Sequence, residues 1–163
     1  MVRPTYAQID LDAIRANFRS VLSHVGGPSG GVEVIAVVKA NGYGHGAVPV
    51  ARALEAAGAT MLACADIEEG VELRQGGVHI PILVFGALSV SDLDGVFSHE
   101  LTPTISSPFA ARALRAEASR RGTRIRCHLK IDTGMNRLGF RYDNLADTVP
   151  MALAGAGLDI DAV

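Results

Sequence analysis

The sequence has only two cysteines, no surplus of charge of either sign and no long apolar run, and each of these absences excludes a class of protein. Among 163 residues, 15 basic side chains face 17 acidic ones, so there is no basic excess of the kind that binds nucleic acid. Cys64 and Cys127 are too few for a disulfide framework, which favours a reducing cytoplasm. The longest apolar stretch, Ile80–Val90, is interrupted by proline and glycine and is too short for a membrane span. The first ten residues contain no apolar run of the secretory type. We therefore expect a cytoplasmic protein that binds neither nucleic acid nor membrane.

The residues that are present favour a buried core built from alternating strands and helices. Hydrophobic residues make up 48% of the chain, which is ample for the core of one domain. The predicted strands are Val32–Ala40, Thr60–Asp66, Ile80–Leu88, Leu101–Ser107, Thr123–Asp132 and Asp159–Val163. Apolar residues at helical spacing predict helices over about Asp12–Val25, Ala47–Ala57, Ile67–Gln75 and Pro108–Arg121, and a last one from Asp143 or Asn144. Gly26–Gly31 is predicted to be a surface loop.

This alternation, repeated about five times, predicts an α/β fold with a parallel sheet and right-handed crossovers. A complete eight-stranded barrel takes about 250 residues, so this chain suffices for only part of one. Periodicity alone leaves open whether the sheet is an open doubly wound one or part of a barrel. Thr5–Ile9 reads as an additional, half-exposed strand that runs directly into the first helix and needs a pairing partner.

Ligands of parallel α/β folds bind at the carboxyl ends of the strands, and Lys39 stands at the end of the first one. Five uncharged residues precede it, so partial desolvation disfavours its ammonium form and favours the neutral amine that Schiff-base chemistry needs. The alternative is a lysine whose stem covers apolar surface while its charge reaches water. The following NGYGHG segment places Tyr43 and His45 between glycines and leads to a helix N-terminus suited to an anion. An ordinary strand-to-helix turn with a structural His45 is the other interpretation.

The fifth predicted strand is apolar on one face and polar on the other, which is unusual for a central parallel strand. Its polar face carries Arg126, His128, Lys130 and Asp132. Either this is a solvated edge strand or the polar face lines a wet cavity. The glycine-containing loop after it presents Arg137, whose planar fork suits a carboxylate or a phenolate-like oxygen, although a surface ion pair would also explain it.

Other chemistries lack a matching pattern. The five histidines have no metal-ligand spacing and neither cysteine has a close cysteine partner, so we expect no metal site. There is no nucleophile-elbow serine and no phosphate-binding or dinucleotide-binding glycine pattern.

Taken together, AVVKANGYGHG at Ala36–Gly46 and LKIDTGMNRLGF at Leu129–Phe140 strongly resemble the alanine racemase family. IDLDAIRANF, LACADIEEGVELR, PILVFGAL and LTPTISS match the family in the same order and spacing, so the resemblance covers essentially the whole chain. It implies that residues 1–163 form the N-terminal portion of a fold-type III barrel domain that holds pyridoxal 5′-phosphate. About five to six of eight strands would be present, with the C-terminal β domain absent from this chain. The family works as a cytoplasmic homodimer.

The resemblance also implies roles for four residues. Lys39 is similar to the lysine that binds the cofactor covalently and acts as a base on the D-alanine side. Tyr43 is similar to a tyrosine that touches the cofactor phosphate. Arg137 is similar to an arginine near the cofactor's phenolic oxygen and the substrate carboxylate. Lys130 is similar to a lysine that is carbamylated in several members and holds that arginine in place.

The implied activity is the pyridoxal-phosphate-dependent interconversion of L-alanine and D-alanine, which supplies D-alanine for peptidoglycan. A racemase for another amino acid, and a non-catalytic pyridoxal-phosphate-binding protein of the same barrel type, are the alternatives. In the family, the ring-stacking histidine, the phosphate loops and the second catalytic base follow the point that matches Val163. We therefore expect the 163-residue chain alone to be inactive or nearly so.

Overall fold

The computed structural model describes residues 3 and 5–163 and confirms the parallel α/β fold. Six strands form one sheet in the order β1-β2-β3-β4-β5-β8, and each neighbouring pair is parallel. The strands are β1 (Ile35–Val37), β2 (Met61–Cys64), β3 (Ile82–Val84), β4 (Thr102–Ile105), β5 (Ile125–Leu129) and β8 (Leu158–Ala162). A separate two-stranded sheet joins β6 (Ile131–Asp132) to β7 (Phe140–Arg141).

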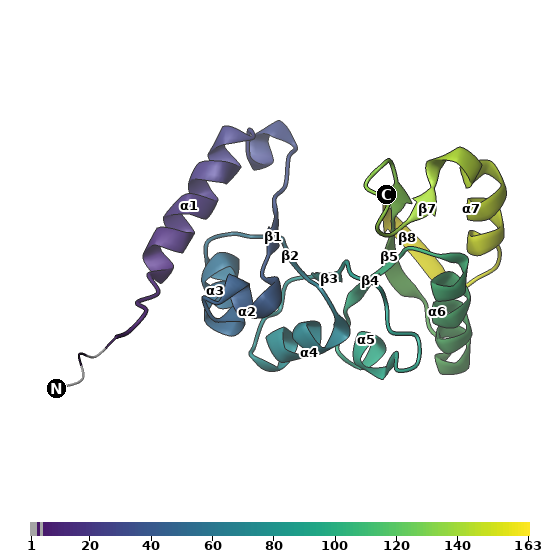
Figure 1. The fold of residues 1–163 in the computed structure, drawn as a ribbon, viewed down its shortest axis with the longest axis horizontal. Coiled ribbons are helices and arrows are strands. Elements are labelled where there is room, and N and C mark those ends of the chain that lie inside the picture. The colour runs from purple at the N-terminus through teal and green to yellow at the C-terminus, as the bar shows by residue number, and fades with distance from the viewer. Residues whose placement is uncertain (1–2, 4) are drawn as a thin grey trace.

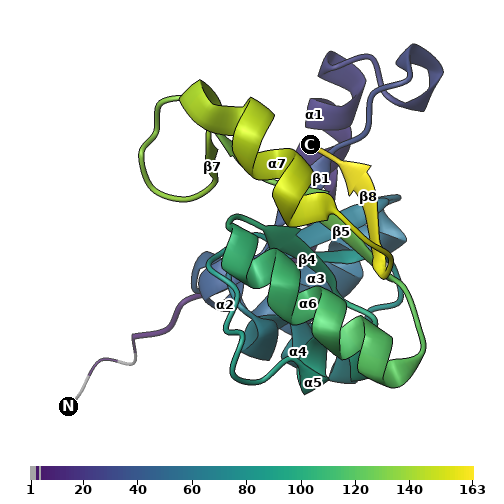
Figure 2. The ribbon, with the colours of Figure 1, turned by 90° about the vertical axis from the view of Figure 1, so that its right-hand side faces the viewer.

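All the helices except the first, which precedes β1, lie between strands along the chain. The helices are α1 (Leu11–His24), α2 (Lys39–Tyr43), α3 (Ala47–Ala56), α4 (Ile67–Gln75), α5 (Asp94–Ser98), α6 (Pro108–Arg121) and α7 (Leu145–Leu153), with short 3₁₀ turns η1 (Pro28–Gly30) and η2 (Tyr142–Asn144). Figure 1 shows α3, α4, α5 and α6 beneath the row of strands, with α1 and α7 standing at its two ends. In Figure 2, α6 and α7 cover the end of the sheet at β5 and β8. None of the described helices is long and apolar enough to cross a membrane.

Side-chain caps fix where the main helices begin. The carboxylate of Asp10 accepts from the backbone N–H groups of Asp12 and Ala13, and Ser107 Oγ accepts from Ala110 N–H. Gly122 ends α6 in the left-handed conformation, with φ of 64°. The predicted helix ends are therefore confirmed to within about a residue.

The core lies between the sheet and the helices on its covered side. Leu62, Ile82 and Ile105 from three neighbouring strands are fully buried, as is Leu114 of α6. Each such side chain contributes about 2 kcal/mol through apolar surface removed from water. The outer strand β1 differs, because Ile35 and Val37 are 44% and 41% exposed. The sheet is therefore well covered at its centre and open at this end.

Two predictions of secondary structure are wrong. Thr5–Ile9 is exposed and forms no strand, because no described strand lies beside it to pair with its backbone. Sequence analysis also gave no helix between the third and fourth strands, where α5 lies. This helix has five residues and buries only Val96, so it leaves no helical periodicity in the sequence.

The predicted strands were also too long at their carboxyl ends. Lys39 and Ala40 belong to a turn and not to β1, and the predicted strand Thr123–Asp132 divides into β5 and β6. Strand-forming side chains continue past the last ladder hydrogen bond, so composition alone does not mark that point.

The position of β5 decides between the two interpretations of its polar face. It lies between β4 and β8, so it is not an edge strand. Ile125, Cys127 and Leu129 are buried, whereas Arg126 is exposed and His128 is partly exposed. The polar face therefore belongs to the uncovered side of the sheet.

Candidate active site

Lys39 stands where β1 ends, at the start of a left-handed turn. Val38 is buried and its N–H donates to Ala63 O at 2.8 Å, which holds the end of β1 against β2. Ala40 (φ 51°, ψ 52°), Asn41 (φ 53°, ψ 47°) and Gly42 (φ 61°, ψ 38°) then adopt left-handed conformations. Such a conformation costs roughly 1–2 kcal/mol for a residue with a side chain, so surrounding contacts must hold the turn.

Three side chains hold this turn. Asn41 Oδ1 accepts from Ala47 N–H at 2.8 Å, at the start of α3, and Glu69 Oε1 accepts from Ala40 N–H at 2.6 Å. His45 Nδ1 lies 3.1 Å from the carbonyl oxygens of Gly42 and of Tyr43, as expected for an N–H that both oxygens share. The structure thus supports the structural interpretation of His45. Sequence analysis missed Asn41 and Glu69, because each accepts from a backbone N–H group that lies well away from it in the sequence.

A cavity of about 660 Å³ opens at the carboxyl ends of β3, β4 and β5. Phe85 and Leu83 form its apolar wall, and Lys130 and Arg137 bring two cationic groups to it. Lys39 Nζ lies 5.5 Å from the centroid of the Phe85 ring, so the amine stands at this wall. The structure therefore brings Lys130 and Arg137 to one cavity and Lys39 to its margin.

Tyr43 lies beside Lys39 but does not line the same cavity. Its ring centroid is 6.0 Å from Lys39 Nζ, and its side chain is 58% exposed. It lines a more apolar hollow between α1 and α3, with Phe18 and Leu54. Of the four residues singled out from the sequence, Tyr43 is thus the most peripheral to the cavity.

The floor of the cavity is polar. Thr104 on β4 is buried, and within the described residues its hydroxyl oxygen has no hydrogen-bond partner. His128 on β5 is its register partner, and both line the cavity. Burial lowers the pKa of His128, although nearby Asp161 opposes this shift, so the surroundings favour the neutral imidazole. His128 of β5 and Lys130 just after it therefore line a cavity able to hold water or a polar ligand, whereas Arg126 lines a different cavity.

The loop that carries Arg137 is shaped by Asp132 and Gly139. Asp132 Oδ1 accepts from the N–H groups of Asn136 and Gly134, both at 3.0 Å, and these bonds lower the pKa of Asp132. Gly139 has a φ of 124°, and a Cβ added to it would lie 2.7 Å from Asp132 N. Only glycine fits there, so the loop is constrained at both ends.

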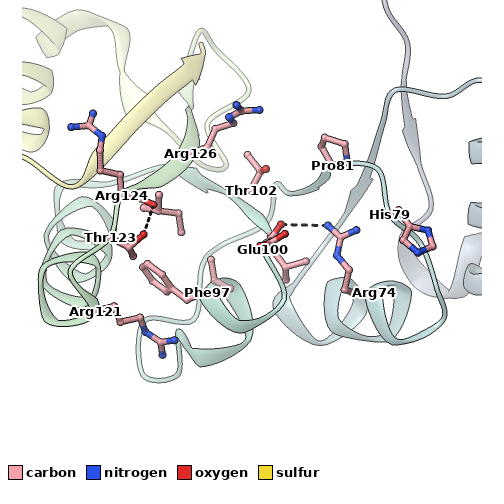
Figure 3. Close-up of a pocket in the computed structure, with 13 residues that line it drawn as sticks. Arg74, His79, Pro81, Phe97, Glu100, Thr102, Arg121, Thr123, Arg124 and Arg126 are labelled. Carbon is pink, nitrogen blue, oxygen red and sulfur yellow. Dashed lines mark hydrogen bonds between the residues drawn. The ribbon is translucent and has the colours of Figure 1, made fainter.

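A second cavity, of about 480 Å³, lies at the amino ends of the strands (Figure 3). It is rich in arginine, but these side chains already have partners. Arg74 donates to the carbonyl oxygens of Val78, Ile80, His99 and Glu100. Arg121 pairs with Asp94 and Glu117, and Arg124 and Arg126 each lie 3.8 Å from an aspartate of β8. These contacts bind the elements together, so we place the candidate site at the carboxyl edge.

In residues 3 and 5–163, no three histidine, cysteine, aspartate or glutamate side chains gather in a way that could hold a metal ion. The chain contains only two lysines, Lys39 and Lys130, and both lie at the carboxyl edge. The fold and the cavity therefore define a parallel α/β protein with a candidate ligand site, amine-bearing and cationic, at the carboxyl ends of its strands.

Comparison with known proteins gives the family. The family model described as "Alanine racemase, N-terminal domain" matches residues 9–163, and the chain belongs to the alanine racemase family. It is 44% identical over 165 residues to the alanine racemase of Desulforamulus reducens, covering 100% of this chain and 44% of that protein. The chain therefore spans less than half the length of this curated relative.

Solved structures of alanine racemases superpose on this chain and support the same family. The alanine racemase of Clostridium difficile 630 superposes with a TM-score of 0.88 at 31% identity, covering 99% of this chain and 42% of that one. The enzyme from Bartonella henselae, described as having covalently bound pyridoxal phosphate, gives a TM-score of 0.77 at 28% identity over 88% of this chain and 42% of that one. The enzyme from Bacillus anthracis, described as having bound L-Ala-P, gives a TM-score of 0.81 at 30% identity, covering 98% of this chain and 42% of that one. The six-stranded sheet is thus part of the N-terminal barrel of this family, and the prediction of an incomplete barrel is confirmed.

Proposed function

We propose that this chain forms the N-terminal part of an enzyme that interconverts L-alanine and D-alanine with pyridoxal 5′-phosphate bound at Lys39. The observation that carries the proposal is the placement of Lys39 in a strained turn, 5.5 Å from the Phe85 ring of a cavity that also holds Lys130 and Arg137. Membership of the alanine racemase family supports it. The whole protein is proposed to act as a cytoplasmic homodimer.

The residues of the cavity fit an aromatic, anionic cofactor. Phe85 and Leu83 offer an apolar wall for a flat ring, and Lys130 and Arg137 offer positive charge. Thr104 adds a buried hydroxyl oxygen that lacks a partner in the described chain. Lys39 supplies the amine that a covalent link to an aldehyde requires, and Tyr43 lies next to it outside the lining of the cavity. When bound, pyridoxal phosphate supplies the electron sink that lets an amino acid lose its α-proton.

The side chains of this chain would then bind and orient the substrate and the cofactor, and would move a proton. Lys39 Nζ would take the α-proton from one face of the substrate, or deliver a proton to that face in the reverse direction, and a second group outside the described residues would serve the opposite face. The Arg137 fork holds the substrate carboxylate or the phenolic oxygen of the cofactor. We further propose that Lys130, once carbamylated, becomes an anion that fixes Arg137. The Phe85 wall excludes water from one side of the reacting atoms.

The test is to purify the product of the complete reading frame that encodes this chain and to follow conversion of L-alanine to D-alanine with added pyridoxal phosphate. We expect turnover in the wild type and its loss in Lys39→Ala. A control, Glu68→Gln, changes an exposed residue away from the cavity and should keep wild-type activity. Activity that survives Lys39→Ala would contradict the proposal.

Two other outcomes would replace the proposed function. Preferential turnover of a different amino acid would identify a racemase of another specificity. Tight binding of pyridoxal phosphate without racemisation of any amino acid would identify a non-catalytic carrier.

A further inference from the structure

The side chain of Glu69 links two turns at the carboxyl edge of the sheet. Its Oε1 accepts from Ala40 N–H at 2.6 Å and its Oε2 accepts from Ala65 N–H at 2.8 Å. Ala40 directly follows Lys39, and Ala65 directly follows β2. Glu69 is partly buried in the first turn of α4, and its bond to Ala65 N–H is part-buried whereas its bond to Ala40 N–H is exposed.

This contact departs from what the local sequence predicts. Asp66 caps α4, and its Oδ1 accepts from Glu69 N–H at 2.9 Å. In a capping box with this spacing, the glutamate side chain returns to the backbone N–H of the capping residue. Glu69 instead reaches the preceding residue, Ala65, and crosses to the neighbouring turn at Ala40. The carboxylate therefore joins the first and second βα turns.

The same link continues to the wall of the cavity. Ala65 O accepts from Gly86 N–H at 3.0 Å, and Gly86 directly follows Phe85. The Phe85 ring in turn lies 5.5 Å from Lys39 Nζ. Glu69 thus contacts the backbone beside Lys39 directly, and reaches the aromatic neighbour of Lys39 through Ala65 and Gly86.

We propose that Glu69 is a positioning residue for Lys39, holding the left-handed turn so that the amine faces the carboxyl-edge cavity. The proposal rests on the proposed function, in which Lys39 is the reactive amine. Both oxygens of an ionised carboxylate accept hydrogen bonds, whereas an amide has one acceptor and one donor group. Glu69→Gln must therefore break either the bond to Ala40 or the bond to Ala65, at nearly unchanged size.

The test uses the two lysines of the chain as an internal reference. Pyridoxal phosphate is added to the 163-residue protein, the covalent adducts are trapped with borohydride, and peptide mass spectrometry gives the ratio of adduct at Lys39 to adduct at Lys130. We expect Glu69→Gln to lower this ratio about tenfold, as the loss of a hydrogen bond to a charged group would do. The matched control is Glu68→Gln, which changes an exposed glutamate on the same helix and should keep the wild-type ratio. General loosening of the fold would change labelling at both lysines, so a selective loss at Lys39 identifies positioning.

A wild-type ratio in folded Glu69→Gln would overturn the proposal. If that variant does not fold, hydrogen exchange of the wild type decides, because the proposal requires the Ala40 amide to exchange at least about tenfold more slowly than an unstructured peptide. Unprotected exchange at Ala40 would overturn it as well. If the proposed function fails instead, the wild type will show no preference for Lys39 while the Ala40 amide stays protected. This result differs from those that would overturn the role of Glu69.

Discussion

Gly86 is the residue at which the backbone at the carboxyl edge is most crowded. A Cβ built on it would lie 2.1 Å from Ala65 O, although its φ is not in the left-handed region. The same carbonyl accepts the Gly86 N–H, so the two turns are in direct backbone contact. The glycine is therefore required by close approach and not by its dihedral angles.

Gly86→Ala should destabilise the protein by about 2–3 kcal/mol, because the backbone of one of the two turns must move. Urea unfolding followed by circular dichroism measures this change. The matched control is Gly30→Ala, since a Cβ at Gly30 meets no atom within 4 Å. Equal stability of the two variants would contradict the assigned role of Gly86.

Single residues also show which parts of the candidate site could be predicted from the sequence alone. Lys39, Lys130 and Arg137 were predicted as site residues, and the structure places the last two in one cavity with Lys39 at its wall. Glu69 was missed because its partners, Ala40 and Ala65, are backbone groups from another turn and from the end of β2. A backbone N–H group has no signature in the sequence, so such a link becomes visible only when the chain is folded.

Among the elements, α6 and α5 are joined by a charge cluster outside the site. Glu117 accepts from the Arg120 Nε–H group at 2.8 Å and pairs also with Arg121, which in turn pairs with Asp94 of α5. Hydrogen bonds from Arg120 and then Arg121 lower the pKa of Glu117 to about 2 from an ordinary value of 4.5. The folded-state pKa is depressed, so the cluster stabilises the fold above pH 4.5 and loses this effect as the pH falls towards about 2.

Glu117→Gln should therefore lower the urea midpoint at pH 7, and its difference from wild type should shrink between about pH 4.5 and about pH 2. Urea titrations at several pH values provide the measurement. Glu72→Gln on α4, an exposed glutamate, serves as the control and should show no such trend. A difference for Glu117→Gln that stays constant down to pH 2 would contradict the assigned pKa.

The elements differ in how well their ends could be predicted. The starts of α1 and α6 were marked by Asp10 and Ser107, whose side chains cap the first turn. The ends of the strands were not marked, because β-forming residues continue into the turns where ligand-facing side chains lie. The strand prediction for Thr5–Ile9 failed for a related reason, since a strand depends on a neighbour that local composition does not reveal.

For the whole molecule, the sheet is open at β1 and at β8. Backbone groups at both edges lack a strand partner within the described chain, and Ile35 and Val37 of β1 are about two-fifths exposed at 44% and 41%. The carboxyl-edge cavity is bordered by Val163, which is 83% exposed. The site of this chain therefore lies open to water, where charge–charge interactions are weak.

The 163-residue chain with excess pyridoxal phosphate should therefore convert L-alanine to D-alanine no faster than the cofactor alone. Racemisation needs a proton carrier on each face of the α-carbon, and within the described residues we assign that role only to Lys39. A coupled assay for D-alanine, run beside a cofactor-only blank, measures the rate. Turnover above the blank that Lys39→Ala abolishes would contradict this expectation.

The central claim is that the fold makes Lys39 the reactive amine of the carboxyl edge, and the adduct ratio in the wild-type chain tests it most directly. The native protein and the protein in denaturant are each treated with pyridoxal phosphate and borohydride, and adducts at Lys39 and Lys130 are quantified by peptide mass spectrometry. We predict a strong preference for Lys39 in the native protein that disappears in denaturant. Equal labelling in both states, or a native preference for Lys130, would contradict the account.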